Sequence, residues 1–223
     1  MTIKRIQIGE NLFAKNDEIA GENAKIFVEN QIFSINLMGS PGSGKTAILE
    51  KLIPELINNG ISCGVIEGDI AGSFDGERIE RFGIPVVQIN TGGACHLEAH
   101  MIRKGIENLP LSGLDMVIVE NVGNLVCPAE FKLGVDFNIT VASVTEGEEK
   151  PVKYPLMYSI SELIVLNKVD LLNAVEFRVE KFKEYVRQVN VQAELINVSG
   201  KTGENIKILA EYIIKKTKQY EKS

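Results

Sequence analysis

The segment from Gly39 to Thr46 constrains the fold of this chain more than any other stretch. It reads Gly-Ser-Pro-Gly-Ser-Gly-Lys-Thr, which is the phosphate-binding loop pattern. An apolar run at 33–38 predicts a strand before it, and helical apolar spacing at 46–59 predicts a helix after it. Such a turn directs backbone N–H groups and a helix N-terminus toward an anion. We therefore expect phosphate contacts from Gly39, Ser40, Gly42, Ser43, Gly44, Lys45 and Thr46.

Four side chains in and after this loop are candidates for the chemistry. Lys45 would supply positive charge to the β- and γ-phosphates, and the Thr46 hydroxyl is placed to ligate Mg²⁺. Asp69 and Asp75 follow a predicted strand and would face the nucleotide crevice of an open α/β sheet. They would hold a Mg²⁺-bound water or orient the attacking water. The alternative is that both belong to a solvated loop.

Strands and helices are predicted to alternate along the chain. Apolar runs predict strands at 62–67, 85–89, 115–120, 136–144, 162–166 and 192–198. Helical spacing predicts helices at 95–109, 177–189 and 206–217. This alternation indicates an α/β fold, in which a doubly wound, mostly parallel sheet carries helices on both faces. We expect a P-loop NTPase domain at 31–223 after an N-terminal helical extension at 1–30, which packs either on this domain or on a partner.

The composition excludes several classes of protein. A formal net charge of −6 gives no electrostatic reason to expect nucleic-acid binding. No apolar run approaches the roughly 18 residues that a membrane span needs, and the N-terminus lacks the pattern of a secretion signal. We therefore expect a cytoplasmic protein that binds neither nucleic acid nor membrane. Its three cysteines are too few for a disulfide framework.

Two later motifs indicate which nucleotide is bound. Asn-Lys-Val-Asp at 167–170 resembles the guanine-recognition motif of GTPases, whose Asp accepts hydrogen bonds from guanine N1 and N2. Ser-Gly-Lys at 199–201 resembles the second base-contacting loop of the same proteins, usually Ser-Ala-Lys. The resemblance implies GTP and GDP as ligands. The implied base-contacting residues are Asn167, Lys168, Asp170, Ser199, Gly200 and Lys201.

The strand predicted at 115–120 ends in a further candidate group. Ras-type GTPases carry Asp-x-x-Gly at this place, and this chain reads Glu-Asn-Val-Gly. Glu120 would hold the Mg²⁺ shell directly or through water, and Gly123 would sense the γ-phosphate through its backbone N–H. No glutamine follows to orient the attacking water. We expect slow hydrolysis of GTP to GDP and phosphate unless a partner or a dimer completes the site.

Two cysteines and a histidine form a second candidate site. Cys95 and His96 open a predicted helix, and Cys127 follows Glu120 closely. Thiols and imidazole suit Zn²⁺ or Ni²⁺, although the spacing is not that of a zinc ribbon and buried cysteines are the alternative. His100, one turn along the predicted helix, would be a fourth ligand, a group that orients a ligand, or a partly exposed helix residue. Three ligands leave a tetrahedral ion one short, which water or a second subunit would supply.

Three longer segments carry a resemblance to one family. They are Gly-Ala-Cys-His-Leu-Glu-Ala-His-Met-Ile at 93–102, Val-Glu-Asn-Val-Gly-Asn-Leu-Val-Cys-Pro-Ala at 119–129 and Glu-Gly-Glu-Glu-Lys-Pro-Val-Lys-Tyr-Pro at 146–155. The chain closely resembles the HypB family of metallochaperone P-loop GTPases from residue 30 onward. The resemblance implies a GTPase that helps deliver Ni²⁺ to the [NiFe]-hydrogenase large subunit, with other maturation proteins as partners. It implies a GTP-bound homodimer whose interface binds Ni²⁺ or Zn²⁺ through Cys95, His96 and Cys127, on segments inserted in the GTPase domain.

The chain also departs from the family pattern. Some members carry an N-terminal Cys-x-x-Cys-Gly-Cys site or a His-rich tract, whereas this chain has only His96 and His100 as histidines. We therefore expect no nickel storage. Ser40 stands where the wider class often has a Lys that reaches across the dimer, and Lys150 and Lys153 are candidates for that contact. Two alternatives stay open: a urease-type nickel metallochaperone GTPase, and a GTP-binding protein whose zinc only staples a dimer.

Overall fold

The computed structural model describes residues 9–70 and 74–220 of the chain. Within these ranges the strands form one seven-stranded sheet in the order β3-β2-β4-β1-β5-β6-β7, and every neighbouring pair is parallel. The strands are β1 (Phe33–Gly39), β2 (Cys63–Asp69), β3 (Val86–Asn90), β4 (Met116–Glu120), β5 (Phe137–Ser143), β6 (Leu163–Asn167) and β7 (Glu194–Asn197). The expected α/β fold with a parallel, doubly wound sheet is confirmed, and the strand ends differ from the predicted ones by at most two residues.

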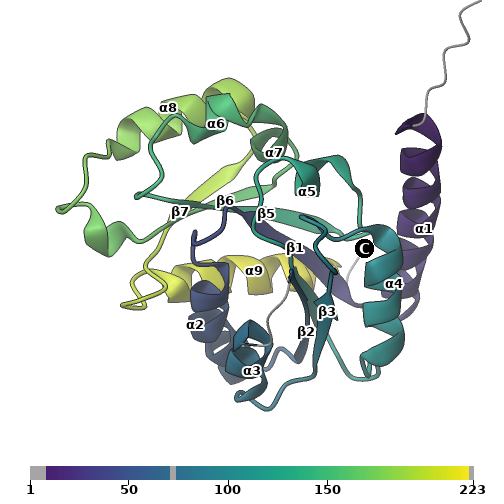
Figure 1. Cartoon of the computed structure of the whole chain (residues 1–223). Helices are drawn as coiled ribbons and strands as arrows, with labels where there is room; N and C mark the ends of the chain where they lie inside the picture. The colour runs from purple at the N-terminus through teal and green to yellow at the C-terminus, as the bar shows by residue number, and fades with distance from the viewer. Residues whose placement is uncertain (1–8, 71–73, 221–223) are drawn as a thin grey trace, which may run out of the picture.

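Helices connect the strands and cover both faces of the sheet (Figure 1). The long ones match the predicted helices at 46–59, 177–189 and 206–217 closely, and the short ones α3, α5, α6 and α7 were not predicted. No helix in the described ranges is long and apolar enough to cross a lipid bilayer. The helices are α1 (Gly9–Glu29), α2 (Lys45–Asn58), α3 (Phe74–Glu80), α4 (Ala99–Asn108), α5 (Cys127–Glu130), α6 (Lys150–Lys153), α7 (Pro155–Ser159), α8 (Val179–Val189) and α9 (Ile206–Tyr220).

Alternate residues of each strand face opposite layers of helices, as the pleat of a strand requires. On β4, Met116 and Ile118 pack in one core with α2 and α9. Val117 and Val119 point to the other face, where they pack with α1 and α4. A further apolar cluster on that second face joins β5 and β6 to α7 and α8. Burial on both faces explains why the strands read as continuous apolar runs.

The helix predicted at 95–109 begins four residues later than expected. Its first residue is Ala99, and the backbone of Glu98 before it is extended, with φ of −109° and ψ of 160°. Side chains from other elements hold this segment outside the helix, because the Leu97 amide donates to Asn121 and the Ala99 amide donates to Asn16. Cys95 and His96 therefore lie in a loop before α4, and they do not share a helical face with His100.

The N-terminal helix α1 packs on the domain itself, next to α4 (Figure 1). The buried Asn23 Nδ2 donates to the carbonyl oxygens of Ala99 (2.8 Å) and Leu133 (3.0 Å). Gly134 allows close approach of the chain to α1, because a Cβ there would lie 2.1 Å from the Ala20 carbonyl oxygen. Its φ of +83° also favours glycine. This contact places α1 against the loop that follows α5.

Candidate nucleotide site and metal cluster

A cavity of about 370 Å³ opens beside the phosphate loop at the carboxyl ends of β1, β2 and β4. The loop is shaped by glycines in left-handed conformation, with φ of +75° at Gly42 and +94° at Gly44. A Cβ at Gly44 would lie 2.3 Å from Asn167 Nδ2, so this position has no room for a side chain. The residues of the cavity that the sequence singled out are Gly42, Gly44, Lys45, Thr46, Asp69, Glu120 and Gly123.

The oxygen ligands expected for Mg²⁺ lie together in this cavity. The Thr46 hydroxyl donates to Glu120 Oε1 over 2.7 Å, and both residues are buried. Glu67, for which the sequence predicted no role, lines the same cavity and is paired in register with Glu120 on the neighbouring strand. A hydroxyl and two carboxylates are hard oxygen ligands of the kind that Mg²⁺ takes. The residues present therefore fit the ion.

The two aspartates that were expected near this cavity lie at different places in the fold. Asp69 ends β2 and lines the cavity, where its Oδ1 accepts a hydrogen bond from the Ile70 amide over 2.6 Å. Asp75 lies at the start of α3, and its side chain is outside the described part of the structure. The geometry thus brings Asp69 to the cavity, and the expectation for Asp75 stays a prediction.

The base-recognition loops are braced against the phosphate loop. Asn167 Nδ2 donates to the Ser43 carbonyl over 2.8 Å, and Asn167 Oδ1 accepts from the Gly200 amide over 2.9 Å. Lys168, with a φ of +63°, donates from Nζ to the Gly42 carbonyl over 2.6 Å. One asparagine thus joins three loops. This side-chain network holds the two loops that resemble guanine-binding loops at the phosphate loop.

The orientation of the Asp170 carboxylate is also fixed. Ser199 Oγ donates to Asp170 Oδ1 over 2.6 Å, so the second motif holds the acid of the first. Lys201 is exposed beside them. At the other end of the phosphate loop, Ser40 Oγ donates to Glu146 Oε1 over 2.5 Å. The loop after β5 therefore contacts the phosphate loop through a residue for which the sequence predicted no role.

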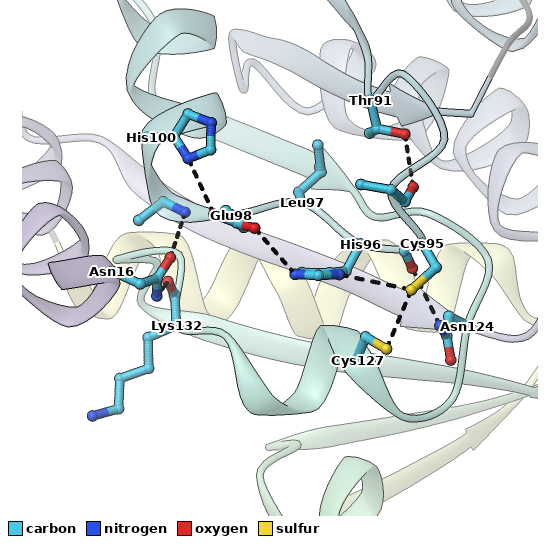
Figure 2. A network of polar contacts seen from close by, with 12 residues as sticks. Asn16, Thr91, Cys95, His96, Leu97, Glu98, His100, Asn124, Cys127 and Lys132 are labelled. Carbon is cyan, nitrogen blue, oxygen red and sulfur yellow. Dashed lines mark hydrogen bonds and ion pairs between the residues drawn. The ribbon is translucent and has the colours of Figure 1, made fainter. Parts of the chain in front are cut away.

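Cys95, His96 and Cys127 lie together although two of them are far from the third in sequence (Figure 2). Their ligand atoms are all within 4.8 Å of one another. The two Sγ atoms are 3.2 Å apart, and Cys95 Sγ is 3.8 Å from His96 Nδ1. Cys63, by contrast, is buried in the core, where burial raises the pKa of its thiol to about 12. The structure thus separates one core cysteine from two that can serve as metal ligands.

The protonation tendencies in this cluster bear on metal binding. Burial lowers the pKa of His96, against the raising effect of the Glu98 and Glu130 charges, so the imidazole is favoured in the neutral form that binds metals. The pKa of the Cys127 thiol is raised, first by its hydrogen-bond contact with Cys95 and then by burial. A bound cation would therefore displace a thiol proton.

His100 lies outside the group of three ligands. Its side chain is 47% exposed, and its Nδ1 is 3.2 Å from Glu98 Oε2 (Figure 2). The predicted helical turn from His96 to His100 does not exist, because α4 begins only at Ala99. The exposed-residue interpretation of His100 agrees with this geometry.

The segment from Glu120 to Cys127 connects the two candidate sites. Asn121 is 1% exposed, and its Oδ1 accepts from the amides of Leu97 (3.2 Å) and Val122 (2.9 Å). Its Nδ2 donates to Asn36 Oδ1 over 3.1 Å. The next residues continue the link, because the Asn124 amide donates to the Gly39 carbonyl of the phosphate loop over 3.0 Å.

Asn124 also contacts the metal cluster through its side chain. Its Nδ2 donates to the Cys95 carbonyl over 3.3 Å, as Figure 2 shows. Gly123 lies against Pro41 of the phosphate loop, since a Cβ at Gly123 would come within 2.8 Å of Pro41 Cα. The segment from Glu120 to Cys127 thus contacts both the phosphate loop and the loop that carries Cys95 and His96. It ends in Cys127, a residue of the metal cluster. Sequence reasoning found its ends, and it assigned no role to the two asparagines.

Comparison with known proteins agrees with these motifs. Residues 33–197 match the family model described as the CobW/HypB/UreG nucleotide-binding domain. A "Hydrogenase maturation factor HypB" of Azotobacter chroococcum is 46% identical over 205 residues, covering 91% of this chain and 66% of that protein. The "Probable hydrogenase maturation factor HypB" of Methanocaldococcus jannaschii is 39% identical over 215 residues, covering 96% of each chain.

A solved structure is also similar over most of the chain. The crystal structure of HypB from Helicobacter pylori in complex with nickel has a TM-score of 0.87 and 35% identity, and the match covers 92% of this chain and 96% of that one. The chain spans about two thirds of the length of the Azotobacter chroococcum relative and nearly all of the Methanocaldococcus jannaschii one. From the phosphate loop, the Cys95–His96–Cys127 cluster and these matches, we conclude that the chain belongs to the HypB family of CobW/HypB/UreG nucleotide-binding proteins.

Proposed function

We propose that this protein is a GTPase that helps insert nickel into [NiFe]-hydrogenase, and that GTP controls both its dimerisation and its metal site. The observation that carries the proposal is the segment from Glu120 to Cys127, which contacts the phosphate loop and ends in a thiol of the candidate metal cluster. The relatives are named as hydrogenase maturation factors, and one solved relative contains nickel. Both facts support a role in supplying nickel to hydrogenase.

The nucleotide half of the proposal assigns a role to each group in the cavity. Lys45 and the loop amides would bind the β- and γ-phosphates, and Asp170 would accept hydrogen bonds from the guanine base. Mg²⁺, held by Thr46 and Glu120, would neutralise charge on the phosphates. In hydrolysis a water oxygen bonds to the γ-phosphorus, the bond to the bridging oxygen breaks, and GDP and phosphate leave. Asp69, which lines the same cavity, would orient that water or hold a Mg²⁺-bound one.

In the metal-binding part of the proposal, Ni²⁺ is the ion that the protein delivers. Cys95, His96 and Cys127 offer two sulfurs and one nitrogen, a donor set that suits Ni²⁺ and Zn²⁺. Water or a ligand from a second subunit would complete the coordination. Cys127 follows the segment in which Gly123 and Asn124 contact the phosphate loop. Release of the γ-phosphate would therefore relax Gly123 and shift one of the three ligands. The site would then weaken and the ion could be handed on.

The surface beside Cys127 favours an interface with a second copy. Val126 (49% exposed) and Leu156 (47% exposed) are large apolar side chains on and near the packed pair α5 and α7, and Val152 on α6 is also exposed. A dimer that covered this surface would bring the metal cluster to the interface. The candidates for a contact across the dimer have local partners: Lys153 Nζ donates to Glu149 over 2.7 Å, and Lys150 lies over the Tyr154 ring.

A single-turnover experiment tests the proposal. The protein is loaded with GTP, Mg²⁺ and Ni²⁺, and phosphate release and nickel transfer to a chromogenic chelator are followed in one sample. We expect nickel transfer to accelerate as phosphate is released, and Lys45→Ala to abolish both signals, while Lys51→Ala on the exposed side of α2 leaves them unchanged. A metal that stays bound through hydrolysis would instead support the alternative, in which zinc only staples a dimer.

A further inference from the structure

We propose that helix α1 and Phe131 position the imidazole of His96 as a metal ligand, an inference that rests on the metal site proposed above. The ring of Phe131 contacts two other rings. Its centroid is 4.1 Å from that of His96, with 32° between the ring planes, and 5.0 Å from that of Phe13 on α1. Two tilted ring contacts, called the Phe13–Phe131–His96 stack below, therefore lead from the N-terminal helix to a residue of the metal cluster.

The contact with Phe131 restrains the ring plane of His96, and Nδ1 is the nitrogen that faces the thiol of Cys95. Nδ1 is 3.8 Å from Cys95 Sγ, and Nε2 is 3.7 Å from Glu98 Oε1 (Figure 2). With one face of the ring against Phe131, the imidazole can meet the cysteines only with one edge. Phe131 is 9% exposed, so the contact excludes most solvent. We assign Nδ1 as the ligand atom.

The backbone around this stack is held by α1 as well. Asn16 is 5% exposed, and its Oδ1 accepts from the Ala99 amide over 2.9 Å while its Nδ2 donates to the Lys132 carbonyl over 2.8 Å. One side chain thus ties the end of the His96 loop to the residue after Phe131. Phe13 and Asn16 are three positions apart in α1, so they lie on the same face of the helix. The helix sets the distance between the imidazole and the ring that supports it.

Groups that orient a metal-binding histidine typically change metal affinity by about 10- to 100-fold when they are removed. A free His96 ring would have to lose its rotational freedom when the metal binds, whereas the stacked ring has already lost it in the apoprotein. An aromatic contact that only stabilises the fold would change the melting temperature and leave metal affinity unchanged. These two roles are therefore separable by experiment.

The test is a double-mutant cycle on Ni²⁺ affinity of the nucleotide-free full chain, followed by the thiolate-to-nickel absorption band. Phe131→Leu should weaken Ni²⁺ binding by about 10-fold, and Phe131→Tyr, which keeps the ring, should restore it. In a His96→Ala background, Phe131→Leu should have no further effect. Phe13→Leu at the exposed end of the stack should weaken binding in the same direction, by less.

The matched control is Phe82→Leu, because Phe82 is a partly buried aromatic that packs against the core on the α2 and α9 face. It should leave Ni²⁺ affinity unchanged. An equal loss from Phe131→Leu with and without His96, or no loss at all, would overturn the positioning role while the metal site stands. If Cys127→Ala left Ni²⁺ affinity unchanged, the metal site itself would be wrong, and the positioning role of Phe131 would be wrong with it.

Discussion

Truncation of Asn121 is the perturbation that most directly probes the link between nucleotide and metal. Asn121→Ala removes an acceptor for the amides of Leu97 and Val122 and a donor to Asn36 Oδ1. All three of these partner residues are at most 3% exposed. The change therefore leaves two N–H groups and one amide oxygen without their present partner, in a place that solvent reaches poorly.

The size of the effect follows from these three lost contacts. A buried polar group left unsatisfied costs about 1–3 kcal/mol, so three such groups at the lower bound cost about 3 kcal/mol. For a chain of this length, 1 kcal/mol lowers the melting temperature by about 2–4 °C, which gives a fall of about 6–12 °C. The metal response should change as well, because Leu97 adjoins His96. We expect the difference in Ni²⁺ affinity between the GTP-bound and GDP-bound forms to shrink.

Two measurements check this prediction on one purified variant. Calorimetry gives the melting temperature of the apoprotein, and titration gives Ni²⁺ affinity in each nucleotide state. Asn108→Ala is the matched control, since Asn108 is exposed at the end of α4 and donates a local hydrogen bond to the Lys104 carbonyl. Its effect on unfolding should stay within about 0.5 kcal/mol. An unchanged melting temperature and an unchanged nucleotide response in Asn121→Ala would show that Asn121 does not connect the two sites.

Three further predictions address the base, the N-terminal helix and the thiols. Asp170→Asn should weaken GDP binding by about 10- to 100-fold in equilibrium titration, since hydrogen bonds to charged groups contribute about 1.5–3 kcal/mol; unchanged affinity would exclude this carboxylate from base recognition. Gly134→Ala should lower the free energy of unfolding by about 2 kcal/mol or more in urea titration, because its Cβ would clash with the Ala20 carbonyl at a φ of +83°; a neutral effect would contradict the docking of α1. Lowering the pH from 8 to 6 should weaken Ni²⁺ binding, because the pKa of Cys127 is raised by its contact with Cys95 and by burial, so its proton must leave; an affinity independent of pH would show that thiolates are not the ligands.

The sequence predicted the features that local patterns determine. The phosphate loop, the seven strands and the motifs at 167–170 and 199–201 each depend on a short run of residues, and the fold follows from their alternation. Glu67 was also within reach of such reasoning. It is a carboxylate near the carboxyl end of an apolar strand, as Glu120 is on the neighbouring one.

The features that sequence reasoning missed depend on contacts between distant residues. The start of α4 was placed too early because the amides of Leu97 and Ala99 are bound by side chains from β4's end and from α1. The pattern at 95–109 carries no trace of those partners. The stack of Phe13, Phe131 and His96 is likewise formed by three separate segments, so no spacing within one segment indicates it.

Control of the metal site by the nucleotide state has one direct test. Ni²⁺ affinity of the full chain is measured with GDP and with a non-hydrolysable GTP analogue, and mass is determined in the same samples. We expect affinity and dimer fraction both to change with the nucleotide, and Cys127→Ala to abolish the metal response. Equal Ni²⁺ affinity in the two states would contradict this expectation, and the cluster of Cys95, His96 and Cys127 would then be a metal site that the GTPase cycle does not control.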